Sequence, residues 1–210
     1  MSTTFLELDS PELDDLLAEA RVCELDAAET VGPAQLADVS LLGIESGLAL
    51  IRAEQPGTFR EVVVCHAGAG SLALPPRETE VLAALVPTRV RLVTPELRDR
   101  LLQIPGAAAV IFDALADTIR QKHQTIEALA NHHHLARVRA KLLQLAAAHG
   151  VVGREGIRLD LPLTHELLAE MTGSARETVT RALDELQQEG TVVRRGRTYR
   201  VLVDPEELST

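Results

Sequence analysis

Aromatic residues are scarce in this sequence, which has three Phe, one Tyr and no Trp among 210 residues. Proteins that bind single-stranded nucleic acid by stacking its bases on aromatic side chains depend on several such residues. The low aromatic content therefore argues against that class. The core must be aliphatic, and hydrophobic residues make up 46% of the chain, which is enough for one large domain or two small ones.

Cysteine is also rare, with only Cys23 and Cys65. Two cysteines are too few for a disulfide scaffold, an all-cysteine zinc site or an iron–sulfur cluster held by cysteines alone. The N-terminus has neither the basic nor the apolar part of a secretion signal, and no apolar run approaches 18 residues. We therefore expect a cytoplasmic protein with no membrane association.

The chain lacks the basic surplus that usually accompanies nucleic-acid binding, because its formal net charge is −10. The acidic excess is not uniform, however. Residues 1–153 carry 13 Lys and Arg against 20 Asp and Glu, whereas residues 154–200 carry 8 of each. The balanced segment is therefore the place to look for a phosphate-binding surface.

Between Arg21 and Val93 the sequence consists of short Val, Leu and Ile runs separated by Gly and Pro. This pattern predicts a β-sandwich or β-roll. The predicted strands are 22–25, 40–44, 48–51, 61–65, 71–74 and 89–93. After Pro105 and Gly106 the pattern becomes helical.

The helical segment after residue 106 has apolar residues spaced like the seam of a coiled coil, with intervals of three and four. Lys122 interrupts this seam and is expected to fix its register. The apolar positions predict a dimerisation face on a long helix. They are Phe112, Leu115, Ile119, Ile126 and Leu129.

Residues 163–186 predict a helix-turn-helix. Thr164 is placed to cap a first helix, and Gly173 allows a sharp turn after it. Ser174 and Glu177 have the spacing of a capping box that would begin the second helix. The core face of the two helices is predicted at Leu167, Leu168, Met171, Val179, Leu183 and Leu186.

The first two turns of the second helix present a polar face suited to a DNA major groove. Arg can donate two hydrogen bonds to guanine, and Glu can accept one from cytosine. After Gly190 comes a predicted hairpin with arginines at or near its tip, which is typical of a wing that contacts phosphates. The predicted base-reading residues are Arg176, Glu177, Thr180 and Arg181. The predicted phosphate contacts are Thr164, Ser174, Thr178, Arg194, Arg195 and Arg197.

The segment reads Thr164…Leu168-Ala169…Gly173-x-x-Arg176-Glu177-Thr178-Val179-x-Arg181-x-Leu183-x-x-Leu186-x-x-x-Gly190. This pattern resembles the DNA-binding signature of Crp/Fnr-type (cyclic AMP receptor protein-like) transcription regulators. The resemblance implies an α+β chain that acts as a homodimer on a palindromic TGTGA-like site in double-stranded DNA and contacts RNA polymerase. It assigns recognition of that half-site to Arg176, Glu177 and Arg181.

The resemblance also implies three parts in order. An N-terminal cyclic-nucleotide-binding-like β-roll would occupy residues 1–105, a long central dimerisation helix 106–134, and a C-terminal winged helix-turn-helix 135–210. Family members that bind cyclic nucleotides have a Gly-Glu-Leu sequence followed about ten residues later by an arginine. Here Ser71 replaces the acid, and Arg77 comes too early and is followed by acidic residues. We therefore expect regulation that does not depend on cyclic AMP.

Other interpretations draw on isolated residues. Cys65 and His66 are neighbours on a predicted strand and would point to opposite faces, which does not suit joint binding of a haem or metal. The run His132–His134 lacks the i, i+4 spacing of helical metal ligands. We expect no cofactor, no metal and no enzymatic activity, since no catalytic triad or phosphate-binding loop is present. A ligand- or haem-dependent sensor and a GntR-like regulator are the alternatives.

Overall fold

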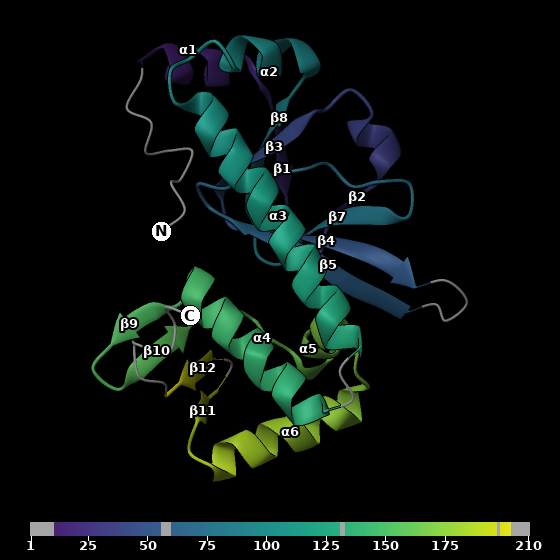
Figure 1. Cartoon of the computed structure of the whole chain (residues 1–210), viewed down its shortest axis with the longest axis vertical. Helices are drawn as coiled ribbons and strands as arrows, with labels where there is room; N and C mark the ends of the chain where they lie inside the picture. The colour runs from purple at the N-terminus through teal and green to yellow at the C-terminus, as the bar shows by residue number, and fades with distance from the viewer. Residues whose placement is uncertain (1–10, 56–59, 131–132, 197, 203–210) are drawn as a thin grey trace. The chain divides into compact units, whose positions relative to one another are not determined.

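The computed structural model describes residues 11–55, 60–130, 133–196 and 198–202 (Figure 1). The chain forms two compact units, Met1–Gln124 and Thr125–Thr210. The boundary between the units falls inside the long helix α3 (Ala107–Ala130). The sequence pattern predicts this long helix, but not a boundary within it. None of the described helices is long and apolar enough to cross a membrane.

The first unit contains two four-stranded antiparallel sheets. Their apolar faces share a core that includes Leu42, Ile51, Leu82 and Val90. In the order of pairing, one sheet consists of β1 (Arg21–Leu25), β8 (Thr88–Val93), β3 (Leu41–Ser46) and β6 (Leu72–Ala73). The other consists of β2 (Thr30–Val31), β7 (Glu80–Ala84), β4 (Leu48–Gln55) and β5 (Arg60–Gly68). These strands confirm the predicted β-roll.

Strands β2 and β7 have no counterpart among the predicted strands, and a short helix that was not predicted follows β8. Strand β7 carries two alanines, which are weak strand formers, and is fixed by pairing with β4 on one side and β2 on the other. Helix α2 (Pro95–Leu101) is short but has a clear start, because the Thr94 hydroxyl accepts a hydrogen bond from the Leu97 N–H and Pro95 occupies the first turn. The signal for α2 was therefore present in the sequence.

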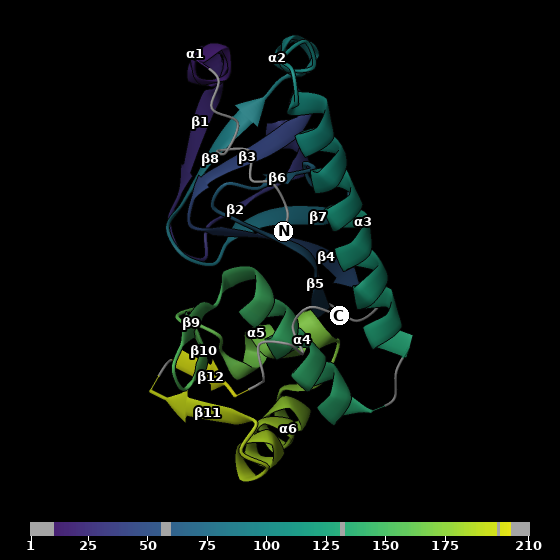
Figure 2. The same ribbon diagram turned by 60° about the vertical axis from the view of Figure 1, so that its left-hand side comes forward.

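Helices close one end of the β-roll. A second apolar cluster joins α1 (Pro11–Glu19), α2 and the first turns of α3 to strands β3 and β8. Leu16, Leu101 and Val110 contribute to this cluster. A 3₁₀ turn, η2 (Pro33–Leu36), follows β2. The second apolar cluster anchors the start of α3 on the β-roll. Figure 2 shows the helix continuing beside the strands.

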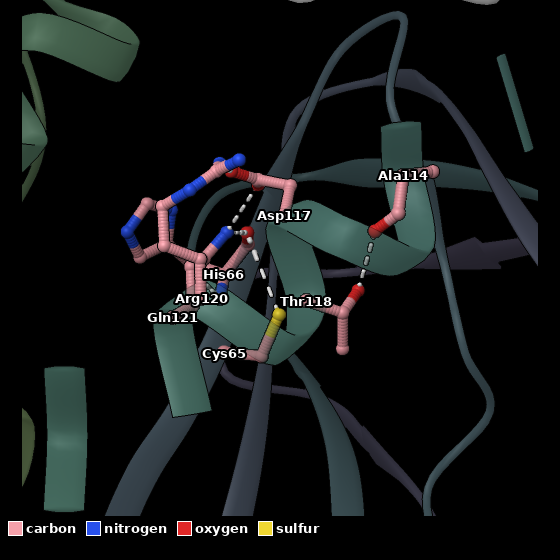
Figure 3. A network of polar contacts seen from close by, with 7 residues as sticks. All are labelled: Cys65, His66, Ala114, Asp117, Thr118, Arg120 and Gln121. Carbon is pink, nitrogen blue, oxygen red and sulfur yellow. Dashed lines mark hydrogen bonds and ion pairs between the residues drawn. The ribbon is translucent and has the colours of Figure 1, made fainter. Parts of the chain in front are cut away.

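Gln121 ties α3 to the edge strand β5 (Figure 3). Its amide oxygen accepts a hydrogen bond from the His66 N–H at 2.9 Å, and its amide nitrogen donates to the His66 carbonyl at 3.1 Å and to Asp117 at 2.8 Å. The side chain thus satisfies both backbone groups of one residue, as a further strand would. One turn of helix is held in register with one residue of β5.

Replacing Gln121 by leucine is expected to lower the free energy of unfolding by about 1–3 kcal/mol, because the buried His66 N–H loses its acceptor and the His66 carbonyl loses its amide donor, although the Cys65 thiol still contacts that carbonyl. Gln124→Leu, a change at an exposed glutamine of the same helix, serves as the control and should lower the free energy of unfolding by less than Gln121→Leu does. Urea unfolding at one protein concentration measures both. Equal stability of the two variants would show that the contact to β5 contributes nothing.

The second unit is a winged helix-turn-helix. Its sheet has the order β11-β12-β10-β9, and all its pairs are antiparallel. Its core is aliphatic apart from Tyr199 and Met171 and includes Leu142, Leu168 and Leu183. The elements are α4 (His134–His149), β9 (Val151–Gly153), β10 (Gly156–Leu159), α5 (His165–Thr172), α6 (Arg176–Gln188), β11 (Val192–Arg195) and β12 (Thr198–Val201).

Candidate nucleic-acid interface

The first helix of the motif, α5, begins and ends as its sequence predicts. The Thr164 hydroxyl accepts a hydrogen bond from the Leu167 N–H at 3.0 Å. Gly173 ends the helix with φ of 59°, in the left-handed region that favours glycine. A Cβ atom at Gly173 would lie 2.1 Å from Leu129 Cδ2. The turn is therefore packed directly against the last residues of α3.

The second helix, α6, does not begin as its sequence predicts. The expected capping box of Ser174 and Glu177 is wrong, because the N-cap residue is Ala175 and it makes no side-chain cap hydrogen bond. Ser174 is buried instead: its N–H donates to the Ala169 carbonyl, and its hydroxyl lies 3.5 Å from His134 Nδ1. The tight turn after Gly173 brings Ser174 to the interior and moves the helix start to Arg176. Glu177 is thus not used as a cap.

Helix α6 has one apolar and one charged face. Val179, Leu183 and Leu186 are buried, as their spacing predicts. The side chains of three predicted base readers, Arg176, Glu177 and Arg181, are exposed and make no hydrogen bond or ion pair with any described residue. The start of the helix therefore offers two donors and one acceptor group to a ligand.

Thr180, the fourth predicted base reader, is engaged within the domain. Its hydroxyl lies 2.8 Å from His165 Nδ1 and donates to the Arg176 carbonyl at 3.0 Å. The His165 ring lies also 3.3 Å from Arg194 Nη1 in the wing. Sequence reasoning did not identify His165, since nothing in the sequence indicates that it lies between the second helix and the wing.

The wing is the hairpin of β11 and β12, and its arginines differ in their surroundings. Arg194 and Arg195 are exposed, and Arg194 lies over the Tyr199 ring, 5.7 Å from its centroid. Arg200 pairs with Glu155 and Arg158 pairs with Asp160, so these two cations are neutralised within the domain. Arg197 lies outside the described residues. Within residues 154–200, the exposed arginines outside these two ion pairs therefore lie at the hairpin tip, on α6 and, with Arg154, in the turn between β9 and β10.

The predicted phosphate contacts are not equally accessible. Thr164 is exposed and Thr178 is partly exposed. Only 8% of the Ser174 surface is exposed, and its hydroxyl faces the domain interior. Of the three hydroxyl residues, Thr164 and Thr178 are therefore the more accessible to a ligand.

The predicted seam of α3 is split between two environments. Phe112, Ile119 and Ile126 are 69%, 69% and 64% exposed. Leu115 packs on the apolar cluster at the end of the β-roll, and the ammonium of Lys122 pairs with Glu80 of β7 at 2.7 Å. Leu129 is partly covered by the turn at Gly173. Three large apolar side chains thus remain as a stripe along α3.

The residues considered for an effector or metal are occupied in other ways. Cys65 is buried, and burial raises the pKa of its thiol to about 11, which keeps it protonated and unreactive at neutral pH. The ring of His134 contacts Arg137 and Ser174. His132 lies outside the described residues. Among the residues described, no group of three His, Cys, Asp or Glu side chains is close enough to hold a metal ion.

Comparison with known proteins supports this description of the domain. Residues 136–210 match the family model described as the Crp-like helix-turn-helix domain. The global nitrogen regulator of Synechococcus elongatus is 36% identical over 92 residues, which cover 44% of this chain and 41% of that protein. The chain thus aligns with less than half of that relative. The match supports the Crp-like interpretation over the GntR-like alternative.

Solved structures share the whole fold. A CooA mutant from Carboxydothermus hydrogenoformans matches with a TM-score of 0.80 and 21% identity over 100% of this chain and 95% of that one. A CRP-family transcriptional regulator from Thermus thermophilus matches with a TM-score of 0.68 and 23% identity, over 89% and 94% of the chains. The chain therefore has a Crp-like helix-turn-helix domain at residues 136–210 and the fold of the Crp/Fnr-type transcription regulators, as its sequence motif predicts.

Proposed function

We propose that this protein is a cytoplasmic, sequence-specific transcription regulator that binds a palindromic TGTGA-like DNA site as a homodimer. One observation carries the proposal: Arg176, Glu177 and Arg181 extend, without partners among the described residues, from the first two turns of a helix-turn-helix second helix. Side chains at this place enter the major groove in winged and unwinged helix-turn-helix proteins. Exposed polar side chains that make no hydrogen bond within the domain are available to hydrogen-bond to base edges.

The chemistry of these three side chains suits G·C pairs. An arginine guanidinium donates two hydrogen bonds to O6 and N7 of guanine, and a glutamate carboxylate accepts one from N4 of cytosine. Arg194 and Arg195 on the wing supply cations for phosphates, which add affinity but carry no sequence information. The domain thus has separate groups for reading bases and for binding the backbone.

The exposed stripe of Phe112, Ile119 and Ile126 supports the homodimer. Three large apolar side chains in a row along one face of a helix are costly in water and are covered when a second copy of the helix packs against them. A two-fold dimer presents two α6 helices to one palindrome. We include RNA polymerase among the partners, as the resemblance implies.

The β-roll supports regulation without cyclic AMP. Ser71 Oγ donates to the Gly68 carbonyl at 2.5 Å and so belongs to its own turn. The Glu80 carboxylate accepts a hydrogen bond from the Arg77 N–H at 3.1 Å and pairs with Lys122. This segment therefore presents a carboxylate, already paired with Lys122, at about the sequence position where the family has its phosphate-binding arginine. Without an arginine at that position, the segment lacks the charge-assisted donor for a cyclic phosphate.

Fluorescence anisotropy with labelled duplexes tests the proposal. An inverted repeat of TGTGA whose half-site centres lie about 10 base pairs apart should bind far more tightly than a duplex with both half-sites scrambled. Cyclic AMP at millimolar concentration should change neither this affinity nor the melting temperature. Binding would be easy to detect, because a ligand at 100 times its Kd adds about 2.7 kcal/mol of stability. Equal affinity for the two duplexes would refute specific recognition, and a melting shift would refute independence from cyclic AMP.

A further inference from the structure

His165 occupies a junction of three elements in the domain. It is the first residue of α5 and is partly buried. Its Nδ1 atom lies 2.8 Å from Thr180 Oγ1 on α6, and its Nε2 atom lies 3.3 Å from Arg194 Nη1 on β11. One imidazole ring therefore connects the second helix of the motif to the wing.

The donors and acceptors of this junction fit only one protonation state of the ring. A guanidinium can only donate, so Nε2 must accept from Arg194 and carries no proton. The remaining proton lies on Nδ1 and is donated to the Thr180 hydroxyl, which in turn donates to the Arg176 carbonyl at 3.0 Å. The chain of hydrogen bonds runs from Arg194 through His165 and Thr180 to the first residue of α6. It requires a neutral imidazole.

The surrounding charges favour the same state. The charged groups that act on His165 are Arg194 of β11 and Arg176 and Asp184 of α6. Burial first, and then the two arginines, lower the pKa of His165 below its usual value, while Asp184 opposes them. Protonation would place a third cation between two guanidinium groups and remove the acceptor of Arg194. The chain of hydrogen bonds is thus intact at neutral pH and is broken on acidification.

Arg194 is held on its other sides as well. Its Nε atom donates to the Gly196 carbonyl at 3.2 Å, and its guanidinium lies over the ring of the buried Tyr199. These two contacts stay within the wing. The contact with His165 connects the Arg194 side chain to α5 and, through Thr180, to α6.

We infer that His165 is a positioning residue, which holds the wing arginine and the second helix in one arrangement while neutral and releases it on protonation, so that acidification weakens specific DNA binding. The inference rests on the proposed function, and it assigns Thr180 to this chain rather than to a base. The opposite role, in which His165 itself contacts a phosphate, predicts the opposite pH dependence, because a polyanion would favour the protonated ring.

The test compares the wild type with His165→Gln and His165→Ala on the inverted-repeat duplex at about pH 8 and about pH 4.5. The lower pH lies well below the usual histidine pKa, because burial and the two arginines lower the pKa of His165 further. The wild type should bind about threefold to tenfold more weakly at the lower pH, the effect of losing about one hydrogen bond. Glutamine accepts and donates without titrating, so His165→Gln should retain the affinity measured at about pH 8 at both pH values. His165→Ala should be weak at both.

Two controls exclude a general effect of pH or of folding. His123→Gln, an exposed change on α3, should keep the pH dependence of the wild type. Circular dichroism at both pH values should show that each variant is folded. Tighter binding of the wild type at low pH, or an unchanged pH dependence in His165→Gln, would overturn the inference.

A measurement without DNA separates this inference from the proposed function. Nitrogen-15 spectra of the histidine rings should show His165 as the Nδ1-protonated tautomer at neutral pH, and Arg194→Ala should raise its pKa. The opposite tautomer or an unmoved pKa would overturn the junction even if DNA binds. A protein with the expected tautomer that binds no DNA at either pH would instead refute the proposed function.

Discussion

Replacing Arg176 or Glu177 by alanine is expected to weaken binding to the inverted repeat by about 1–3 kcal/mol per half-site and to relax the preference at one G·C pair. Both side chains are exposed on the first turn of α6, and neither makes a hydrogen bond or ion pair with a described residue, so removing either breaks no such contact. Binding is compared at about pH 8, because Arg176 also helps to lower the pKa of His165. The loss should appear in binding and not in stability. Selection from a library of half-sites measures which base preference changes.

Arg195→Ala provides the matched control, because it also removes an exposed arginine but from the wing. It should weaken binding to all sequences alike and reduce the salt dependence by about one phosphate contact, with base preferences unchanged. Measurements at two salt concentrations separate the two classes. If Glu177→Ala leaves base preference unaltered, Glu177 does not read a base, and the same outcome for Arg176→Ala would show that the family's recognition of TGTGA does not apply here.

Changing Ile119 and Ile126 together to aspartate is expected to convert a dimer into monomers at micromolar concentration. The pair lies in the exposed stripe of α3, and two buried carboxylates would face two more across the two-fold axis. Leu115 is a poorer choice despite its place on the predicted seam, because it packs on the cluster at the end of the β-roll and its replacement would damage the unit itself. Sedimentation velocity measures the change.

Arg120→Asp is the control for charge, because it changes the net charge by as much as the double variant does. Arg120 is exposed and pairs with Asp117 on its own helix, outside the stripe. This variant should remain a dimer. A monomeric wild type, or a double variant that still dimerises, would show that the stripe is not the dimer interface.

The sequence by itself determined the second unit nearly completely. The turn at Gly173, the cap at Thr164 and the buried positions of α5 and α6 all follow from local rules, since helix caps and a 3.6-residue period depend on neighbours within a few residues. The wing hairpin around residue 196 follows from its turn residues in the same way. Local interactions can be read from local sequence.

Only the tertiary structure decided features that join distant segments. Ser174 and Glu177 have the spacing of a cap, yet the packing of the turn against Leu129 and His134 moves the helix start to Arg176. Nothing near Lys122 in sequence indicates that its partner is Glu80. These outcomes depend on which surfaces meet after folding.

The same distinction explains the contacts of Gln121 and His165. Gln121 satisfies the backbone of His66, 55 positions away, and His165 lies between Thr180 and Arg194, 15 and 29 positions away. Glutamine and histidine carry no periodicity signal of their own on a helix, so their sequence positions give no indication of a role. The sequence determined which helix presents the charged face, while the fold decided which of its polar side chains are engaged internally and which remain available to DNA, because hydrogen-bond partners are set by three-dimensional proximity.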